Sequence, residues 1–349
     1  MTAAVARDVD AALARVGDEV AGRASALDSD QTDVRVDIAA LGAQGLFDAG
    51  LTGADLTSMV RVIEHVATSS LAVGFAAWAH RMTIEYVSLA PAVFRAAQLP
   101  GLTLGQRPGV TAMAAGLKHV AGLGDVPIVA SEHPDGLRVT GPIRWASNVF
   151  PDALMVLPAR GTDGATYVVA IDVSTDGVRI ERPPNLMALT ATASTSLHLD
   201  RVQVPAENVI STDLQDFVAR IRPAFLLLQT AFCVGVSVAA LDGARSARGV
   251  LAGQFTTELA DLARRSQALR ERLYAFAAAP SDPGIADLLR LRLGAAGLAG
   301  QASRLEVTLA GGAGYALGTA VNRRFREAAF LPIQSPSEGQ LRWELTQYE

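Results

Sequence analysis

The order in which helical and strand-like segments follow one another is the feature that most constrains the fold of this chain. Roughly the first hundred residues repeat apolar side chains at three- and four-residue spacing, which predicts helices. From about Gly109 to Ile210, short β-branched runs alternate with turn residues, which predicts strands. Helical spacing returns after Asp213 and holds to the end. We therefore predict an α+β protein with a helical domain at 1–108, an antiparallel β-domain at 109–212 and a second helical domain at 213–349.

Local patterns within this order predict individual elements. The longest N-terminal helix is expected at Leu56–Leu89, with Thr52 and Asp55 as its candidate N-caps. Hairpin turns are expected at 133–136, with the sequence His-Pro-Asp-Gly, and at 162–164, with the sequence Thr-Asp-Gly.

The composition excludes several classes of protein. The formal net charge is -5 over 349 residues and no block of Lys and Arg stands out, so no nucleic-acid partner is expected. The single cysteine, Cys233, excludes an intrachain disulfide and fits a reducing, cytoplasmic environment. The histidines are scattered without metal-ligand spacing, so no metal is expected. Among them, His80 is expected to be a core or surface residue rather than a catalytic one.

The most apolar stretch, Ala224–Leu241, approaches the length of a membrane span. Gln229, Thr230 and Ser237 interrupt it, so we expect a helix buried in a bundle and no membrane partner. The N-terminal residues carry charges every few positions without an apolar signal core, so no secretory signal is expected.

A first motif joins a tryptophan to small polar residues between two predicted strands. It reads Arg-Trp-Ala-Ser-Asn at Arg144–Asn148 and is followed by Asp152. The Trp145 indole can pack on a flat aromatic ligand, while the Ser147 hydroxyl and nearby backbone amides can bond its nitrogens and oxygens. The alternative interpretation is a core tryptophan followed by a Ser-Asn turn.

A second motif is the glycine-rich segment Gly311–Tyr315, followed by an Arg-rich helix at Val321–Ala328. Glycines after a helix permit positive φ and close backbone approach, so bare amides can meet a phosphate or a nucleotide. No strand precedes the segment, so it is not a Rossmann fingerprint. A simple helix–helix turn is the alternative.

A third motif runs from Met187 to Leu199 and continues through Val202–Val209. Its strand alternation is clear, and the sequence Val-Pro-Ala-Glu-Asn marks the exit from the β-domain.

Together these three motifs resemble the acyl-CoA dehydrogenase superfamily in residues, order and spacing. Members carry Lys-x-Trp-Ile-Thr-Asn and then Ala-Asp; the counterpart here is Ile143–Asn148 and then Asp152. Members carry Ser-x-Thr-x-x-Leu-x-Phe-x-x-Val-x-Val-Pro-x-x-Asn, which the segment 192–208 matches loosely. Members carry Gly-Gly-x-Gly-Tyr before an Arg-rich helix, which Gly311–Arg326 matches well. The resemblance covers the chain from about Gly109 to its end.

The resemblance implies a fold, a cofactor and partners. The fold would be an N-terminal helical domain, a middle antiparallel β-barrel-like domain and a C-terminal four-helix bundle. The cofactor would be FAD, with FMN left open, and the substrate an acyl-CoA thioester. The assembly would be a homodimer or homotetramer, or a heteromer with a related subunit. The implied flavin contacts are Trp145, Ala146 and Ser147, the backbone of Thr111, Ala112 and Met113, and, near the adenosine and often across a subunit boundary, Gly311, Gly312 and Gly314.

The chain departs from the family at the catalytic base. The family places a glutamate in a C-terminal Tyr-Glu-Gly-Thr loop; aligned from Ile333, that position holds Ser335. A serine without a partner is a poor base for a carbon acid. Glu338 lies three residues further on and is the remaining candidate, with a solvent-facing or capping role as its alternative. Some members place the base on the first long helix after the β-domain, but Arg220–Gly235 contains no acid.

Three functions follow from these departures. The first is α,β-dehydrogenation of an acyl thioester by a flavin enzyme with a displaced or replaced base. The second is a flavin monooxygenase on the same fold, which needs no carboxylate at the α-carbon. The third is a non-catalytic subunit of a heteromeric dehydrogenase, because the family's Arg-x-x-Phe-Gly segment for the FAD pyrophosphate also has no clean match.

Overall fold

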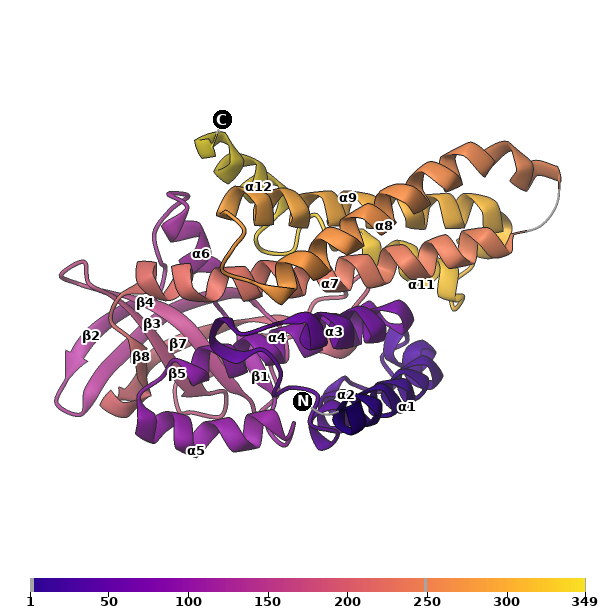
Figure 1. Cartoon of the computed structure of the whole chain (residues 1–349). Coiled ribbons are helices and arrows are strands. Elements are labelled where there is room, and N and C mark those ends of the chain that lie inside the picture. Colours follow the sequence, from indigo (N-terminus) through magenta and orange to yellow (C-terminus); the bar gives the residue numbers. More distant parts are fainter. Residues whose placement is uncertain (1–2, 248–249, 349) are drawn as a thin grey trace.

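The computed structural model describes residues 3–247 and 250–348. Along the sequence, helices come first and last and the strands lie between them, so the predicted α–β–α order and the α+β class are confirmed; Figure 1 shows these elements in the folded chain. The N-terminal helices are α1 (Ala3–Asp28), α2 (Arg35–Ala43), the short 3-10 helix η1 (Leu51–Gly53), α3 (Thr57–Ser69), α4 (Leu71–Ser88) and α5 (Ala92–Thr103).

The middle of the chain forms one sheet of eight strands within the described residues. The elements are β1 (Gly109–Thr111), α6 (Ala114–Val120), β2 (Val129–His133), β3 (Gly136–Ala146), β4 (Leu154–Gly161), β5 (Thr166–Asp172), β6 (Val178–Ile180), η2 (Thr190–Thr192), β7 (Thr195–Pro205), η3 (Ala206–Asn208) and β8 (Val209–Ser211). The strand order is β6-β7-β3-β2-β4-β5-β8, with β1 paired to β4.

The sheet is mostly antiparallel, as predicted, and both expected hairpins are present. β2 and β3 pair with His133 opposite Gly136, and β4 and β5 pair with Arg160 opposite Thr166. The exceptions are β1 and β2, which both pair with β4 in parallel. β1 follows α5 and pairs with β4. It therefore brings the chain from the N-terminal helices into the sheet.

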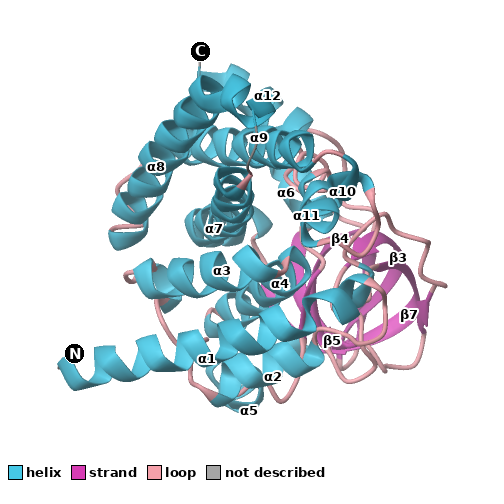
Figure 2. Cartoon of the chain, turned by 90° about the vertical axis from the view of Figure 1, so that its right-hand side faces the viewer, coloured by secondary structure: helices cyan, strands magenta, loops and turns pink. Residues whose placement is uncertain are grey.

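The C-terminal part is helical. Its elements are α7 (Leu214–Ser246), the 3-10 helix η4 (Val250–Phe255), α8 (Thr256–Ala278), α9 (Ile285–Ala310), α10 (Gly312–Tyr315), α11 (Ala320–Ala328), α12 (Glu338–Leu345) and η5 (Thr346–Tyr348). α7, α8 and α9 pack against one another, and α3 and α4 cover the other side of α7. Seen end-on, the sheet lies beside this stack of helices rather than within it (Figure 2).

α7 contains the apolar stretch that the composition singled out. Among the described helices, it is the one that is long and apolar enough to cross a membrane by length and composition alone, with a mean hydropathy of 2.1 over its 18 most apolar consecutive residues. Of these 18 residues, 89% are buried inside the protein. At Gly235, an added Cβ would lie 2.4 Å from the Glu64 carbonyl oxygen of α3. The glycine therefore permits the close crossing of two helices, which is typical of a bundle core.

The expectation of one helix over Leu56–Leu89 is wrong, because the chain breaks at Ser70. Ser70 has extended backbone angles (φ -155°, ψ 118°), so α3 ends at Ser69 and α4 starts at Leu71. Neither predicted N-cap occupies the cap position of α3, which is Leu56: Thr52 lies in η1, and Asp55 lies two residues before the helix, where its Oδ1 accepts a hydrogen bond of 2.7 Å from the Thr57 amide.

Candidate functional site

A cavity of about 740 Å³ lies where the sheet meets the helices. Its lining comes from β1 and β3, from α4, α6 and α7, from the segment 186–189, and from the connection between α11 and α12. This volume is typical of small-molecule and cofactor sites. The lining therefore joins segments from all three parts of the chain.

One side of the cavity is formed by the ends of two strands, and we call it the sheet wall. It consists of Thr111 and Ala112, at the end of β1, and of Trp145, Ala146 and Ser147, at the end of β3. All five were expected to contact a flavin. The structure brings the two groups together because β1 and β3 approach the helices at the same end of the sheet.

An irregularity in β3 turns the Trp145 indole into the cavity. Residues on β3 alternate between buried and exposed as far as Ile143, and then two consecutive residues, Arg144 and Trp145, are exposed. The pairing of β3 with β7 shifts register between Ile143 and Ala146, so one extra residue is accommodated in β3. As a result, Trp145 keeps 58% of its surface exposed while lining the cavity.

At the sheet wall, hydroxyl groups form a hydrogen-bonded chain with a fixed direction. The Ser147 and Ser194 hydroxyl oxygens lie 2.6 Å apart, and those of Ser194 and Thr192 lie 2.7 Å apart. Thr192 donates its one hydroxyl proton to the Leu189 carbonyl at 2.7 Å. Ser194 must then donate to Thr192, and Ser147 to Ser194, because each hydroxyl has one proton. Ser147 therefore presents lone pairs, rather than a proton, to the cavity.

Two buried side chains attach β1 to the neighbouring elements at Gly109. The Gly109 amide donates to His80 Nδ1 at 2.9 Å, and Asn148 Nδ2 donates to the Gly109 carbonyl at 3.1 Å. The other His80 nitrogen donates to the Leu102 carbonyl at 2.9 Å. Asn148 also donates to the Ala76 carbonyl at 3.0 Å, so it connects the end of β3 to α4 as well. We call these contacts the Gly109 clamp.

The Gly109 clamp depends on an uncharged His80. Burial lowers the pKa of His80 from 6.5 to about 4, because a fully buried imidazole loses the hydration that its charged form requires. The neutral ring accepts at Nδ1 and donates at Nε2, which satisfies both nitrogens. A Cβ at Gly109 would lie 2.6 Å from the Thr83 Cβ, so only glycine fits beside α4. His80 is thus a core residue, as expected, and it does not line the cavity.

The opposite side of the cavity is aromatic, and we call it the helical wall. It is formed by Phe75 and Trp78 of α4, Phe225 of α7 and Phe330, which follows α11. The first three are only 6%, 3% and 2% exposed. This wall therefore offers an apolar surface with almost no accessible polar atom.

The connection between α11 and α12 lines the cavity and contains Ser335, which the sequence resemblance aligns with the family's base. Gln229 Nε2 and Gln334 Nε2 both donate to the Ser335 carbonyl, at 2.8 Å and 2.7 Å. Arg292, fully buried, donates to the oxygens of both glutamine side chains, at 3.2 Å and 3.0 Å, and to the Leu331 carbonyl at 3.0 Å. Within the described residues, Arg292 forms no ion pair with a carboxylate. A buried cation thus holds the Ser335 segment through neutral amides.

Among the described residues, no carboxylate forms a hydrogen bond with the Ser335 hydroxyl. The Ser335 hydroxyl oxygen is buried and has no hydrogen-bond partner within the described part of the chain. Glu338 is not in the lining, and its carboxylate accepts hydrogen bonds from Arg342 of the same helix at 2.7 Å and 2.9 Å. Of the described residues that line the cavity, Asp125 is the one acid, and 77% of its side chain is exposed.

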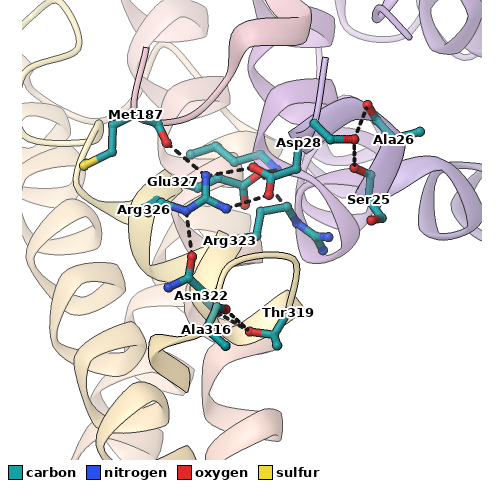
Figure 3. Close-up of polar contacts among 12 residues, drawn as sticks. Ser25, Ala26, Asp28, Met187, Ala316, Thr319, Asn322, Arg323, Arg326 and Glu327 are labelled. Atoms are coloured by element: carbon teal, nitrogen blue, oxygen red, sulfur yellow. Dashed lines mark hydrogen bonds and ion pairs between the residues drawn. The ribbon is translucent and has the colours of Figure 1, made fainter. Parts of the chain in front are cut away.

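Arg326 connects three distant segments at the edge of the cavity (Figure 3). Its guanidinium donates to Asp28 at the end of α1 at 2.9 Å, to the Met187 carbonyl at 2.9 Å, and to Asn322 one turn earlier at 2.8 Å. Met187 belongs to the exposed segment 181–188 between β6 and η2, and it also lines the cavity. Arg326 therefore anchors this segment at the edge of the cavity.

The other residues expected to contact the cofactor lie elsewhere. Met113 is fully buried and does not line the cavity. Gly311 caps the end of α9 with a positive φ of 57°, and Gly312 and Gly314 lie in the short α10, away from the cavity. No group of three or more potential metal ligands was found among the residues described.

Comparison with solved structures identifies the architecture. The chain superposes on butyryl-CoA dehydrogenase from Megasphaera elsdenii with a TM-score of 0.88, over 100% of this chain and 98% of that one, at 17% sequence identity. The chain has the acyl-CoA dehydrogenase fold. The resemblance found in the sequence is therefore confirmed at the level of the fold.

Other structures with the acyl-CoA dehydrogenase fold match the chain over nearly its whole length. FkbI, described as acting in biosynthesis of a methoxymalonyl extender unit for the polyketide Fk520, has a TM-score of 0.82 and 23% identity, over 96% of this chain and 98% of that one. PigA, solved with FAD and proline, has a TM-score of 0.84 and 14% identity, over 100% of this chain and 98% of that one. No protein-family model and no curated protein matches the sequence.

Several residues of the site were not expected from the sequence. The helical wall comes from Phe75, Trp78, Phe225 and Phe330, and the buried cation behind Ser335 is Arg292. Each lies in a segment with ordinary helical spacing, and no motif distinguishes it there. Only their convergence in space assigns them to the site.

Proposed function

We propose that the chain is a flavin-dependent oxidoreductase that binds FAD against the sheet wall. The observation that carries the proposal is the presence of the exposed Trp145 indole and the Ser147 hydroxyl in one cavity. A flat apolar face with a hydrogen-bonding group beside it matches the ring system of a flavin, which is planar and has nitrogen and oxygen atoms at its edge. The residues present fit that ring, and PigA, which shares the fold, binds FAD.

We further propose an acyl thioester as the second ligand. The sheet wall would be covered by the flavin, which leaves the helical wall for an apolar group. Butyryl-CoA dehydrogenase, with the same fold, acts on such a thioester. Lys118 and Arg144 line the cavity at its exposed side and can pair with the phosphates of the carrier group.

The chain's own residues would orient both ligands. A bound flavin supplies an acceptor for two electrons. Trp145, Ala146 and Ser147, with Thr111 and Ala112, would hold its ring, and the hydroxyl chain leaves Ser147 as a hydrogen-bond acceptor toward it. The helical wall would exclude water from the reacting carbon atoms.

The finer reaction depends on a proton acceptor. Removing the α-proton of a thioester requires a positioned base, and Ser335 with its buried hydroxyl does not supply one. This observation favours a second candidate on the same fold, a flavin monooxygenase, whose reduced flavin reacts with oxygen and needs no base at that carbon. Glu338 is paired with Arg342, and we assign it no catalytic role.

The absorption spectrum of the purified protein tests the proposal. Flavin bands in the protein as isolated, or after incubation with FAD, are expected; a colourless protein that does not take up FAD would overturn it and favour a non-catalytic subunit. Anaerobic bleaching by an acyl-CoA supports dehydrogenation. Persistent oxidised flavin with every thioester, combined with oxygen consumption by the reduced protein in the presence of substrate, supports the monooxygenase.

We also infer that the active assembly is an oligomer. The turn containing Gly311–Gly314 lies away from the cavity, and the neighbouring Tyr315 and Leu317 are 87% and 79% exposed. Exposed aromatic and aliphatic side chains beside a glycine turn suit contact with a second subunit. Light scattering of the purified protein measures its mass directly.

A further inference from the structure

The helical wall is closed by aromatic side chains that pack on one another. Phe75 stacks on Trp78 with ring centroids 5.4 Å apart, and Phe330 meets Phe75 edge-to-face at 4.9 Å. Phe225 meets Trp78 edge-to-face at 4.9 Å. Such contacts stabilise a fixed arrangement of rings beyond the burial of their area. The four rings therefore form one continuous surface at the cavity.

This surface is also held from behind. Trp78 Nε1 donates a hydrogen bond of 3.3 Å to the Phe225 carbonyl, which ties α4 to α7 at the wall. Phe232, fully buried one layer deeper, contacts both Phe75 and Trp78 with centroids 6.1 Å and 6.0 Å away. Moving one ring aside would break contacts of several others, and interiors of this density do not open without cost. No ring of the wall can give way independently.

The helical wall consequently limits how far a ligand can extend between the helices. Phe225 comes from α7 and Phe330 from the segment that follows α11, and both line the cavity together with Phe75 and Trp78 of α4, so the wall closes the cavity on its helical side. Each alkyl carbon added to a ligand must find apolar surface to contact, and it clashes where side chains already fill the space.

We propose that the helical wall restricts the substrate of this site to thioesters of short acyl groups, with Phe225 as a specificity-determining residue. The inference rests on the proposed function, since it takes the flavin and the thioester as the two occupants of the cavity. Phe225 is the informative position because it lines the cavity, is 2% exposed, and is placed by α7 directly against Trp78.

The test measures binding rather than turnover. FAD-loaded protein is titrated with acetyl-, butyryl-, octanoyl- and dodecanoyl-CoA, and dissociation constants are taken from calorimetry and from the change in the flavin spectrum. We expect acetyl- or butyryl-CoA to bind at least about tenfold more tightly than octanoyl-CoA, because an apolar pocket of fixed depth discriminates by roughly this factor per misfit group. Phe225→Ala is expected to shift the preference toward octanoyl-CoA by about tenfold.

Matched variants distinguish a deeper cavity from a general loss of stability of the fold. Phe217 lies on the same helix, is also 2% exposed and does not line the cavity, so Phe217→Ala should leave the order of affinities unchanged. Phe225→Leu is a smaller change that opens the wall only partly. It replaces Phe225→Ala in the affinity measurements if the alanine variant does not fold.

The outcomes are distinguishable. Tighter binding of octanoyl- or dodecanoyl-CoA to the unmodified protein, with flavin bound, would overturn the short-acyl proposal and leave the proposed function intact. An order of affinities that is the same in Phe225→Leu, Phe225→Ala and the unmodified protein would remove Phe225 as its cause. A protein that binds neither flavin nor any thioester would overturn the proposed function, and the short-acyl proposal with it.

Discussion

The two walls of the cavity differ in what they leave open. The sheet wall presents an indole with 58% of its surface exposed and a serine whose lone pairs point to the cavity. In the helical wall, the rings contact one another, and the Trp78 indole nitrogen already donates its hydrogen bond to the Phe225 carbonyl. The sheet wall therefore leaves a flat ring and hydrogen-bond acceptors exposed, whereas the helical wall presents closely packed rings.

The segment around Ser335 belongs to neither wall and shows what the site lacks. Its polar atoms are directed inward, toward Gln229, Gln334 and the buried Arg292. The proposed ligand-binding surfaces and the segment that contains Ser335 thus belong to different elements of the fold. If the proposed function holds, the surfaces for a cofactor are kept while the expected base position holds a serine.

The Gly109 clamp joins α4, a helix of the helical wall, to the strand that ends in the sheet wall, and acid should break it. In the unfolded chain His80 takes up a proton below about pH 6.5, whereas burial lowers its pKa to about 4 in the folded protein. The stability from neutral His80 is therefore complete above pH 6.5 and is lost as the pH falls toward 4. We expect this group to remove about 3 kcal/mol over that range.

Chemical unfolding between pH 4 and pH 8 measures this loss. The His80→Gln variant should lose the part of the pH dependence that this residue causes, while His198→Gln, at a half-buried histidine of β7, should retain it. Identical pH profiles for the unmodified protein and His80→Gln would show that the imidazole is not the titrating group.

Trp145 tests the sheet wall alone. Removing its exposed ring in Trp145→Ala should weaken FAD binding by about 2 kcal/mol, roughly thirtyfold, because the flavin loses its stacking surface. Trp145→Phe keeps a flat ring and should lose much less. Phe225→Ala, on the opposite wall, should change thioester affinity and leave flavin affinity nearly constant. Equal loss of flavin in the Trp145 and Phe225 variants would mean that the two walls do not act separately.

The sheet wall could be predicted from the sequence because its main residues are contiguous. Trp145, Ala146 and Ser147 follow one another, and the family resemblance pointed to Thr111 and Ala112 in the segment before the β-domain. The exposure of Trp145 could not be predicted, since it depends on a shift in pairing between β3 and β7. The direction of the hydroxyl chain depends on the hydrogen bond from Thr192 to the Leu189 carbonyl, and no sequence pattern predicts that bond.

The helical wall could not be predicted, because its residues are far apart in sequence. Phe75 and Phe330 are separated by most of the chain, and each is an ordinary apolar residue in a helical pattern. The break at Ser70 could not be predicted either, because apolar side chains keep helical spacing on both sides of it. This break separates α3 from α4, the helix that carries Phe75. Long-range packing decided these features, and local sequence does not encode it.

Ser147 gives the smallest expected effect and the finest test of the sheet wall. Reduction of a flavin by two electrons adds an N–H donor to its ring, so an acceptor at Ser147 should favour the reduced form. Ser147→Ala should therefore lower the reduction potential of bound FAD by about 1 kcal/mol, on the order of 20 mV. Spectroelectrochemistry measures the shift, with Ser131→Ala on β2 as a control for loss of an exposed hydroxyl.

Ser194→Ala should lower the potential as well, because Ser147 would then be free to donate its proton to the oxidised ring. A higher potential in Ser147→Ala would mean that Ser147 acts as a donor and that the hydroxyl chain runs the other way once flavin is bound.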